Sequence, residues 1–283
     1  SEIAARAVDN PMLALALSAA FAGPMLKPCN AESGGIHFIG NSSIGKTTAT
    51  DGACSTWGDE KYRRSWRATA NGMEGAAARF NDCLLALDDV SEADPKEVGA
   101  IVYSLGNGTG KQRAGRTGSA RAVVHFRCMV LSNGERTIET TMAEGGYRAK
   151  AGQGVRMLDI PAERRFGIFD ELHGFPDGAA FSDAIKKSAA RHHGHAGRAF
   201  LQKLTHDKRD FPALLERIKA LKEFSADGAE GQDKRAAGRF AMLALAGELA
   251  TEYRITGWPE GEAIKAAAIG FTAWRSIRRS EER

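Results

Sequence analysis

Cysteine is scarce in this chain, and its spacing does not suit a metal site. The 283 residues include four cysteines, and no two of them form a C-x-x-C pair. A zinc ribbon is therefore disfavoured. Most of the four lie in or beside apolar runs, where a reduced and buried cysteine is the expected state. Free thiols fit a reducing compartment, and we expect a cytoplasmic protein.

No apolar run in the sequence is long enough to cross a bilayer. The most apolar stretch, Met12–Phe21, is about half the length of a spanning helix. Arg6 before it and small residues after it resemble a signal peptide, but Glu2 and Asp9 put acid where such a leader is basic. We therefore expect Met12–Phe21 to form a buried helix leading into the first strand, and we expect no contact with a membrane.

Proline-rich linkers and long polar tracts are absent as well. The sequence has only 8 prolines, and its composition is that of an ordinary globular protein. Its length suits one large domain, or a core domain with a smaller attachment. The formal net charge is +4. Because this surplus is small, only local clusters of charge can indicate an anionic partner.

The strongest motif is a phosphate-binding loop. Gly40–Thr47 matches the pattern G-x-x-x-x-G-K-[ST], between an apolar strand at Ile36–Ile39 and a segment, Thr47–Trp57, that can form a helix. Glycines let successive N–H groups point at phosphate oxygens beside a helix N-terminus. We expect Lys46 to contact the β- and γ-phosphates of ATP. The expected ATP-binding residues are Gly40, Asn41, Ser42, Ser43, Ile44, Gly45, Lys46, Thr47 and Thr48.

A second motif supplies acids downstream of this loop. Cys83–Leu87 is an apolar strand that ends in Asp88-Asp89, which is the Walker B arrangement. We expect Asp88 and the Thr47 hydroxyl to hold Mg²⁺, and Asp89 to orient or deprotonate the attacking water. An acid pair at a strand end is usually a solvated turn, and its coupling to Gly40–Thr47 favours the functional interpretation.

A polar residue after the next strand completes the pattern. Ala122–Leu131 is expected to be that strand, and Asn133 is the candidate sensor that hydrogen-bonds the attacking water or the γ-phosphate, while Glu135 is expected to begin the next helix. The order of these motifs predicts an α/β fold, namely a P-loop NTPase of the additional-strand (AAA+/RecA-like) type. Its mostly parallel sheet is expected to lie between helices.

A glycine-rich loop between the acid strand and the sensor strand carries only positive charges. It spans Gly106–Arg121 and contains no acid. Such a loop suits the phosphate backbone of DNA. The alternatives are a solvated surface loop and a loop that contacts the nucleotide of a neighbouring subunit. The candidate DNA-binding residues are Lys111, Arg113, Arg116 and Arg121.

A second basic loop, Gly145–Arg156, precedes the expected last strand, Val155–Ile160. Ring ATPases place an arginine finger at this position, where it neutralises transition-state charge in the adjacent subunit. Arg148 and Arg156 both qualify, and for either one alone a plain surface arginine is an equal alternative. The position predicts a homo-oligomer, with a ring as one form.

From Gly174 onward apolar residues recur at helical spacing, which predicts a helical C-terminal part. We expect an ATPase core at residues 1–175 and a helical subdomain at residues 176–283. The Arg191–His195 cluster is expected to be a solvated helix connection, because no convincing further metal ligands lie near it in the sequence.

Several strings of this sequence together resemble one family over most of the chain, from about the first strand to Trp274. The family is domain-of-unknown-function family 927. The strings are Asn41–Thr48, Trp57-Gly58, Trp66–Thr69, Asn71–Glu74, Leu87–Ala93, Leu131–Glu135, Arg156–Pro161 and Gly257–Gly261.

The resemblance implies a helicase-like ATPase of phages, integrated elements and staphylococcal-type cassettes, similar to the ring-forming, AAA+-like MCM helicases. It also implies an upstream region with primase-like or DNA-binding parts, so that this chain is the motor portion of a longer protein. One position departs from the family. Asp89 stands where Glu is expected, and its shorter side chain implies slower hydrolysis or a bridging water.

Two functions fit these observations. The first is an ATP-hydrolysing DNA helicase or translocase that works as a ring oligomer and acts on single- or double-stranded DNA in the replication of a phage or mobile element. The second is a nucleotide-dependent assembly switch or scaffold that does not move on DNA, which the shorter Asp89 and the modest net charge favour. A small-molecule kinase is disfavoured, because nothing resembles a lid for an acceptor.

Overall fold

The computed structural model describes residues 2–112, 122–147, 154–225 and 231–281. Within them, apolar strands form one five-stranded sheet in the order β2-β3-β4-β1-β5, and every pair of neighbours in it is parallel. The strands are β1 (Gly34–Ile39), β2 (Arg64–Ser65), β3 (Cys83–Asp88), β4 (Cys128–Gly134) and β5 (Met157–Pro161).

The position of β4 identifies the fold class. β4 lies between β1, which leads into the phosphate-binding loop, and β3, which ends in Asp88. This is the additional strand expected from the sequence, and the predicted α/β P-loop fold is confirmed. Because all strands run in one direction, the residues that follow β1, β3, β4 and β5 meet at one edge of the sheet.

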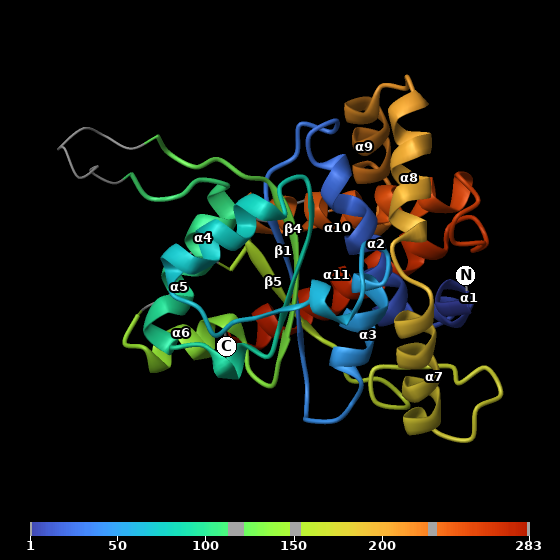
Figure 1. Ribbon diagram of the computed structural model, residues 1–283, viewed down its shortest axis with the longest axis horizontal. Coiled ribbons are helices and arrows are strands. Elements are labelled where there is room, and N and C mark those ends of the chain that lie inside the picture. Colours follow the sequence, from blue (N-terminus) through green and yellow to red (C-terminus); the bar gives the residue numbers. More distant parts are fainter. Residues whose placement is uncertain (1, 113–121, 148–153, 226–230, 282–283) are drawn as a thin grey trace.

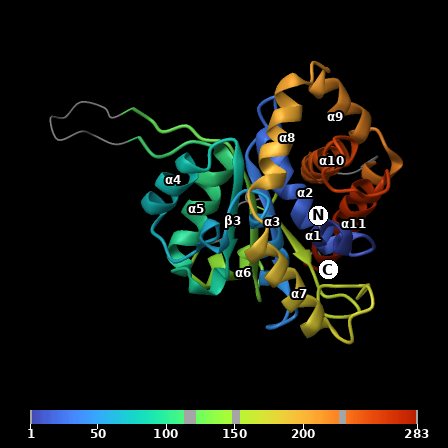
Figure 2. The ribbon, with the colours of Figure 1, turned by 45° about the vertical axis from the view of Figure 1, so that its right-hand side comes forward.

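Helices cover both faces of the sheet, as Figures 1 and 2 show. Met73, Val98 and Met142 belong to an apolar cluster that packs one group of helices against Leu85 and Val130 of the sheet. That group comprises α4 (Ala70–Arg79), α5 (Pro95–Asn107) and α6 (Ile138–Glu144).

The other face is covered by a thicker helical layer built around α2 (Pro11–Met25). Every residue of α2 is buried, so the predicted buried helix at Met12–Phe21 is confirmed. The helix packs on β3 and β4 from one side and against α10 (Gly231–Glu252) and α11 (Glu262–Glu281) from the other. α3 (Lys46–Cys54) also packs against it.

The remaining helices form the rim of this layer. Trp258 and Trp274 are buried here as packing anchors, and the Trp258 indole N–H donates to the carbonyl of Ala4. The rim helices are α1 (Glu2–Ala7), α7 (Gly178–Arg191), α8 (His195–His206) and α9 (Phe211–Lys219).

The predicted boundary near residue 175 lies in the segment between β5 and α7, and the division into two domains stays a prediction.

Side-chain caps mark the start of two of these helices. Helix α4 begins at Ala70, and the Thr69 side chain accepts from the N–H of Gly72. Helix α5 is capped by Asp94, which accepts from the N–H of Lys96. Both caps satisfy backbone donors that the helix leaves unpaired.

The sensor strand β4 is shifted along the chain from its expected position. It begins at Cys128 instead of Ala122 and continues through Asn133 to Gly134. The following helix, α6, begins at Ile138, where the Thr137 side chain accepts from Thr140 N–H. Glu135 therefore lies in the connection at the sheet edge rather than in a helix.

Across the described ranges, no helix is both long and apolar enough to span a membrane.

The close packing of α2 on the sheet leads to a stability prediction. A Cβ added at Gly23 would lie 2.3 Å from the backbone carbon of Cys83, whereas one added at Gly75 in α4 would meet nothing within 4 Å. We expect Gly23→Ala to lower the free energy of unfolding by about 1–3 kcal/mol, because the helix must move away from β3. Gly75→Ala, the matched control, should raise it by up to about 1 kcal/mol. Urea unfolding of both variants measures this, and equal effects would show that α2 does not press on β3.

Candidate nucleotide-binding site

The loop after β1 has the backbone shape that the glycine pattern predicts. Gly45 has φ +100° and caps the N-terminus of α3, while Ser43 also has a positive φ. Only glycine adopts such a conformation readily, so Gly45 is the residue that lets the chain turn into the helix. A turn after β5 supports the loop from behind, where the N–H of Ile168 donates to the carbonyl of Ile44 at 2.7 Å.

Lys46 points back into this loop. Its Nζ donates to the carbonyls of Gly40 at 2.8 Å and Asn41 at 2.6 Å, and the residue is 8% exposed. Burial lowers the pKa of Lys46, and the negative charges of four carboxylates oppose that shift. An ammonium held against a loop that ends at a helix N-terminus is suited to bind phosphate. The four carboxylates are those of Glu135, Asp89, Asp88 and Glu163.

Asp88 connects the loop helix to the sensor strand. Its Oδ1 accepts from the Thr47 hydroxyl at 3.1 Å and from Asn133 Nδ2 at 2.8 Å. Asn133 Nδ2 also donates to the Thr50 hydroxyl at 3.1 Å. Three predicted site residues from β3, β4 and α3 therefore meet, and Thr47 with Asp88 offers the hard oxygen ligands that Mg²⁺ prefers.

Arg63 is part of this cluster and was not anticipated from the sequence. Its Nη1 lies 2.8 Å from Asp51 Oδ1 and 3.4 Å from Asp88 Oδ2. Burial raises the pKa of Asp51, and the positive charge of Arg63 opposes that shift. Arg63 directly precedes β2, whose Ser65 pairs in register with Asp88. This β2–β3 pairing brings Arg63 to Asp88, and the sequence could not indicate it because the sequence does not reveal which strand lies beside β3.

Asp89 adopts a strained backbone conformation beside this cluster. Its φ is +49°, and its N–H donates to Asn133 Oδ1 at 3.1 Å. Its own carboxylate accepts from the N–H and the hydroxyl of Ser91, at 3.1 and 2.6 Å. Non-glycine residues with positive φ persist only where the surroundings hold them. Asn133 thus holds the Asp88 carboxylate and the Asp89 backbone, while the Asp89 carboxylate caps the turn that follows it.

Glu135 is an additional acid at this edge. It follows β4 directly, is exposed, and contributes to the field at Lys46 together with Asp88 and Asp89. The expectation that Glu135 begins a helix hid it, because helix starts commonly carry acids. With it the site contains three acids from the ends of β3 and β4.

A buried hydrogen-bond chain supports the sensor strand from within the sheet. The His37 ring lies 2.8 Å through Nδ1 from the Ser132 hydroxyl and 2.9 Å through Nε2 from the Arg136 carbonyl. Trp66 donates to the same hydroxyl at 2.8 Å. In a neutral His37, Nε2 carries the proton because the Arg136 carbonyl can only accept, and Nδ1 then accepts from the Ser132 hydroxyl. Burial lowers the pKa of His37 to about 4.

Other predicted site residues lie away from this edge. Arg156 directly precedes β5 and is therefore at the opposite edge of the sheet. Lys111 is exposed beyond the C-terminus of α5, and its N–H donates to Glu74. The predicted residues Arg113, Arg116, Arg121 and Arg148 lie outside the described residues.

The residues present fit a nucleoside triphosphate and a divalent cation. The loop offers backbone donors at a helix N-terminus, and Lys46 already contacts loop carbonyls at hydrogen-bond distance. Thr47 and Asp88 lie side by side at the start of that helix and the end of β3. In the described part of the chain, no group of three or more His, Cys, Asp or Glu residues could hold a metal by itself, including around Arg191–His195.

Comparisons with known proteins agree with the fold. Residues 1–125 match the family described as "Domain of unknown function (DUF927)", which confirms the predicted resemblance for this part of the chain. No curated protein matches the sequence.

Among solved structures, "SCCmec type IV Cch - active helicase" matches with a TM-score of 0.66 and 19% identity, over 98% of this chain and 47% of that one. At this identity the likeness shows a shared fold, and the chain spans about half the length of that helicase. NtrX from Brucella abortus, in complex with ATP, has 15% identity over 79% of this chain and 66% of its own, and its TM-score of 0.33 is too low to bear on the fold.

The lowered pKa of His37 predicts a pH-dependent stability. The unfolded chain binds a proton near pH 6.5, whereas the folded protein does so only near pH 4, so stability is lost as the pH falls between these values. From pH 7 to pH 5, the unfolding free energy of the wild type should fall by about 2 kcal/mol more than that of His37→Gln. His206→Gln, at an exposed position on α8, is the control and should follow the wild type. Parallel pH profiles for wild type and His37→Gln would refute a neutral buried imidazole.

Proposed function

We propose that this chain is the ATP-hydrolysing motor of a DNA helicase or translocase that works as a ring oligomer in the cytoplasm. The observation that carries the proposal is the cluster of Thr47, Asp88 and Asn133 beside the phosphate-binding loop. The fold shared with a helicase supports it.

In this proposal ATP binds along Gly40–Thr48, with Lys46 turning from the loop carbonyls to the phosphates. Mg²⁺, when bound, would neutralise charge on the β- and γ-phosphates. Thr47 and Asp88 would hold that ion. The carboxylates around Lys46 support this assignment, because so much negative charge would repel a triphosphate unless a cation lay between them.

Asp89 and Asn133 would position the attacking water. Asn133 already holds the N–H of Asp89 and an oxygen of Asp88, so it sets the distance between the two acids. The Asp89 carboxylate must leave the N–H and hydroxyl of Ser91 before it can accept a proton from water. That exchange is a control point in this proposal, since it costs two hydrogen bonds to a charged group, about 1.5–3 kcal/mol each.

The proposed arginine finger acts on a neighbouring subunit. Arg156 lies at the amino end of β5, about 20 Å along the strands from the loop at the carboxyl end of β1. It cannot reach its own nucleotide, so any role in hydrolysis requires a second copy of the chain. Arg156 contacts Asn107 at 2.7 Å and lies over the ring of Tyr103, which is 54% exposed. Arg148 is the alternative finger.

The basic loop would bind DNA as an extension of the sheet's amino-end edge. Its two described arms pair in antiparallel fashion, with Phe126 N–H donating to Gly108 and Gly110 N–H donating to Val124. They leave the molecule side by side in Figure 1. Lys111 lies on one arm, and Arg113, Arg116 and Arg121 follow in the sequence. The lack of acids in this segment supports an anionic strand as its partner.

The match to about half of a mobile-element helicase supports a role in replication of a phage or mobile element, with an upstream domain in the whole protein. One observation favours the alternative function of an assembly switch. The Asp89 carboxylate is engaged by Ser91, which would keep hydrolysis slow until a partner releases it.

One experiment separates motor from switch. ATP hydrolysis by the wild type is measured with and without single-stranded DNA, and particle mass is measured with and without a non-hydrolysable ATP analogue. We expect DNA to raise the rate several-fold and the analogue to produce a ring. Lys46→Ala should abolish hydrolysis, while Lys61→Ala, at an exposed position, should not. A rate independent of DNA would leave only the switch, and hydrolysis by Lys46→Ala would reject the site.

The identity of the acid that activates water is testable within the site. We expect Asp89→Asn to lower kcat by about 100-fold or more with little change in KM for ATP, because the variant keeps the shape but not the base. Glu135→Gln, the matched control at the same edge, should change kcat only a few-fold. The reverse order of effects would transfer the role to Glu135.

A further inference from the structure

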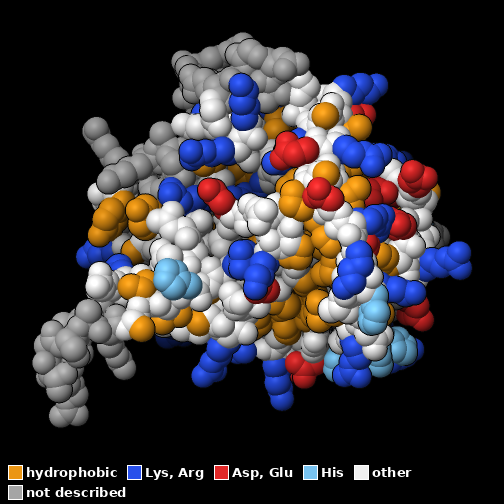
Figure 3. Space-filling view, turned by 90° about the horizontal axis from the view of Figure 1, so that it is seen from above, with side chains coloured by type: hydrophobic (Ala, Val, Ile, Leu, Met, Phe, Trp, Pro, Cys, Tyr) orange, Lys and Arg blue, Asp and Glu red, His pale blue; other side chains and the backbone are white. Residues whose placement is uncertain are grey.

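A second concave site lies at the edge of the sheet opposite the nucleotide site. It is a cavity of about 1260 Å³. Its lining includes Ser33, Arg127 and Arg156, which immediately precede β1, β4 and β5. Because these strands are parallel, the cavity lies at their amino ends, a full strand length from Lys46. Figure 3 looks onto this edge, where Lys and Arg side chains gather around a hollow.

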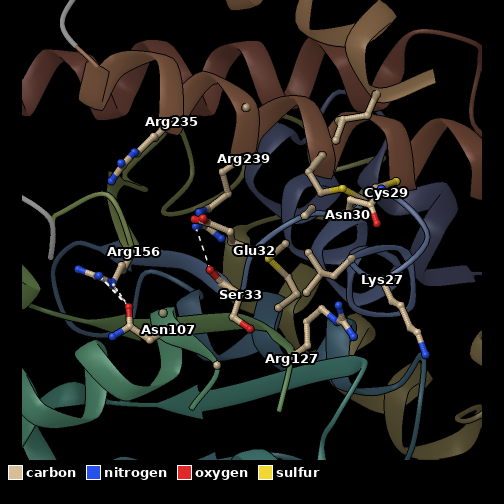
Figure 4. A pocket seen from close by; sticks show the side chains of 18 of the residues that line it. Lys27, Cys29, Asn30, Glu32, Ser33, Asn107, Arg127, Arg156, Arg235 and Arg239 are labelled. Carbon is tan, nitrogen blue, oxygen red and sulfur yellow. Dashed lines mark hydrogen bonds between the residues drawn. The ribbon is translucent and has the colours of Figure 1, made fainter. Parts of the chain in front are cut away.

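Helix α10 forms the opposite wall of the cavity with cationic side chains. Arg235 and Arg239 extend from it toward Ser33, and Arg156 approaches from the side of β5, as Figure 4 shows. Lys234 lines the cavity as well. The cations thus come from three parts of the fold and converge on one space.

Arg239 is the most constrained of these cations. Its Nη2 donates to the Ser33 carbonyl at 3.1 Å, while its Nε is buried and has no hydrogen-bond partner among the described residues. Gly34 makes room for the guanidinium, since a Cβ there would lie 2.3 Å from Nη1. Burial lowers the pKa of Arg239 to about 10, so it stays charged at neutral pH. A buried donor without an acceptor is costly unless a ligand supplies one.

The acids that line the cavity do not balance its cations. Arg127 is paired with Asp82 at 2.9 Å, and Lys219 is paired with Glu216 at 2.8 Å. Glu32 is the other acid in the lining, and it is exposed. Besides Arg156, the lining contains the cations Lys27, Lys234, Arg235 and Arg239, so its positive charges outnumber its negative charges. The cavity is therefore suited to an anion.

The paired arms of the basic loop, where they leave the sheet, form part of the same wall. Gly108, Thr109, His125 and Phe126 belong to both the paired arms and the cavity lining. A nucleic-acid strand that follows these paired arms toward the sheet would reach Arg235 and Arg239 next. A cavity of this size also exceeds a single phosphate group and suits several linked ones.

We propose that this cavity binds the phosphates of a nucleic-acid strand that approaches along the paired arms 108–112 and 122–126, with Lys234, Arg235 and Arg239 of α10 as its main contacts. The strand would then be held between α10 and the amino ends of β1 and β4. The proposal rests on the proposed function, which supplies the nucleic-acid substrate.

The test uses exposed residues so that the fold is preserved. Binding of labelled single-stranded oligothymidylate is measured by fluorescence anisotropy over a salt series for Lys234→Ala plus Arg235→Ala. The control, Lys187→Ala plus Arg191→Ala, removes the same charges from exposed positions on α7. Loss of two phosphate contacts should weaken binding roughly ten-fold and reduce the salt slope by roughly 1.4. The control should keep the slope of the wild type.

The outcomes separate the cavity from the motor. If the wild type binds DNA and the cavity variant keeps the slope of the control, the cavity proposal is overturned and the motor stands. If the cavity variant loses affinity but DNA never stimulates hydrolysis, the cavity stands and the motor fails. A wild type that binds no DNA overturns the cavity proposal. The proposal is also overturned if the cavity variant binds DNA like the control but hydrolyses ATP poorly. That result would indicate that the cavity contacts the nucleotide of a neighbouring subunit.

Discussion

The candidate nucleotide site depends on one carboxylate oxygen, Oδ1 of Asp88. It accepts from the hydroxyl of Thr47 at the start of α3 and from Asn133 on β4, and its partner oxygen faces Arg63 before β2. Elements that are far apart in sequence are therefore fixed to each other through the end of β3. Because each donor belongs to a different element, a shift of any strand along its neighbour would break the cluster.

The parallel sheet gives the molecule two edges of opposite charge. At the carboxyl ends, acids surround Lys46, and at the amino ends, arginines from α10 and from before β5 surround a cavity. A ring that apposes the edges of neighbouring subunits would bring Arg156 toward the acids and phosphates of the next chain. The same polarity leaves α10 free to contact a nucleic-acid strand without competing for ATP. The separation thus leaves room for both of the proposed phosphate-binding roles in one chain.

The sequence predicted those candidate site residues that belong to a short local motif. The loop at Gly40–Thr47 and the acids at Asp88-Asp89 were found because each is a pattern of neighbouring residues. Such patterns can be recognised in the sequence before the fold is known. Arg63 was missed because its role depends on β2 lying beside β3, which is a tertiary fact. The turn of Asp89 toward Ser91 depends on a backbone torsion that its residue type disfavours. The cavity was missed because its cations are spread from Lys27 to Arg239.

The burial of α2 limits which parts of the molecule can move during a nucleotide cycle. α10 and α11 cover this helix, and all of its residues are buried. Swinging these helices away as a lid would expose α2, at about 25 cal/mol for each Å² of apolar surface. The carboxyl-end edge has cheaper alternatives. Asp89 can exchange its bonds to Ser91, and Lys46 can exchange its bonds to the loop carbonyls, at about 1.5–3 kcal/mol for each hydrogen bond to a charged group. If ATP binds as proposed, the change that it causes should therefore begin at Asp89 and Asn133, while the α2 layer stays fixed.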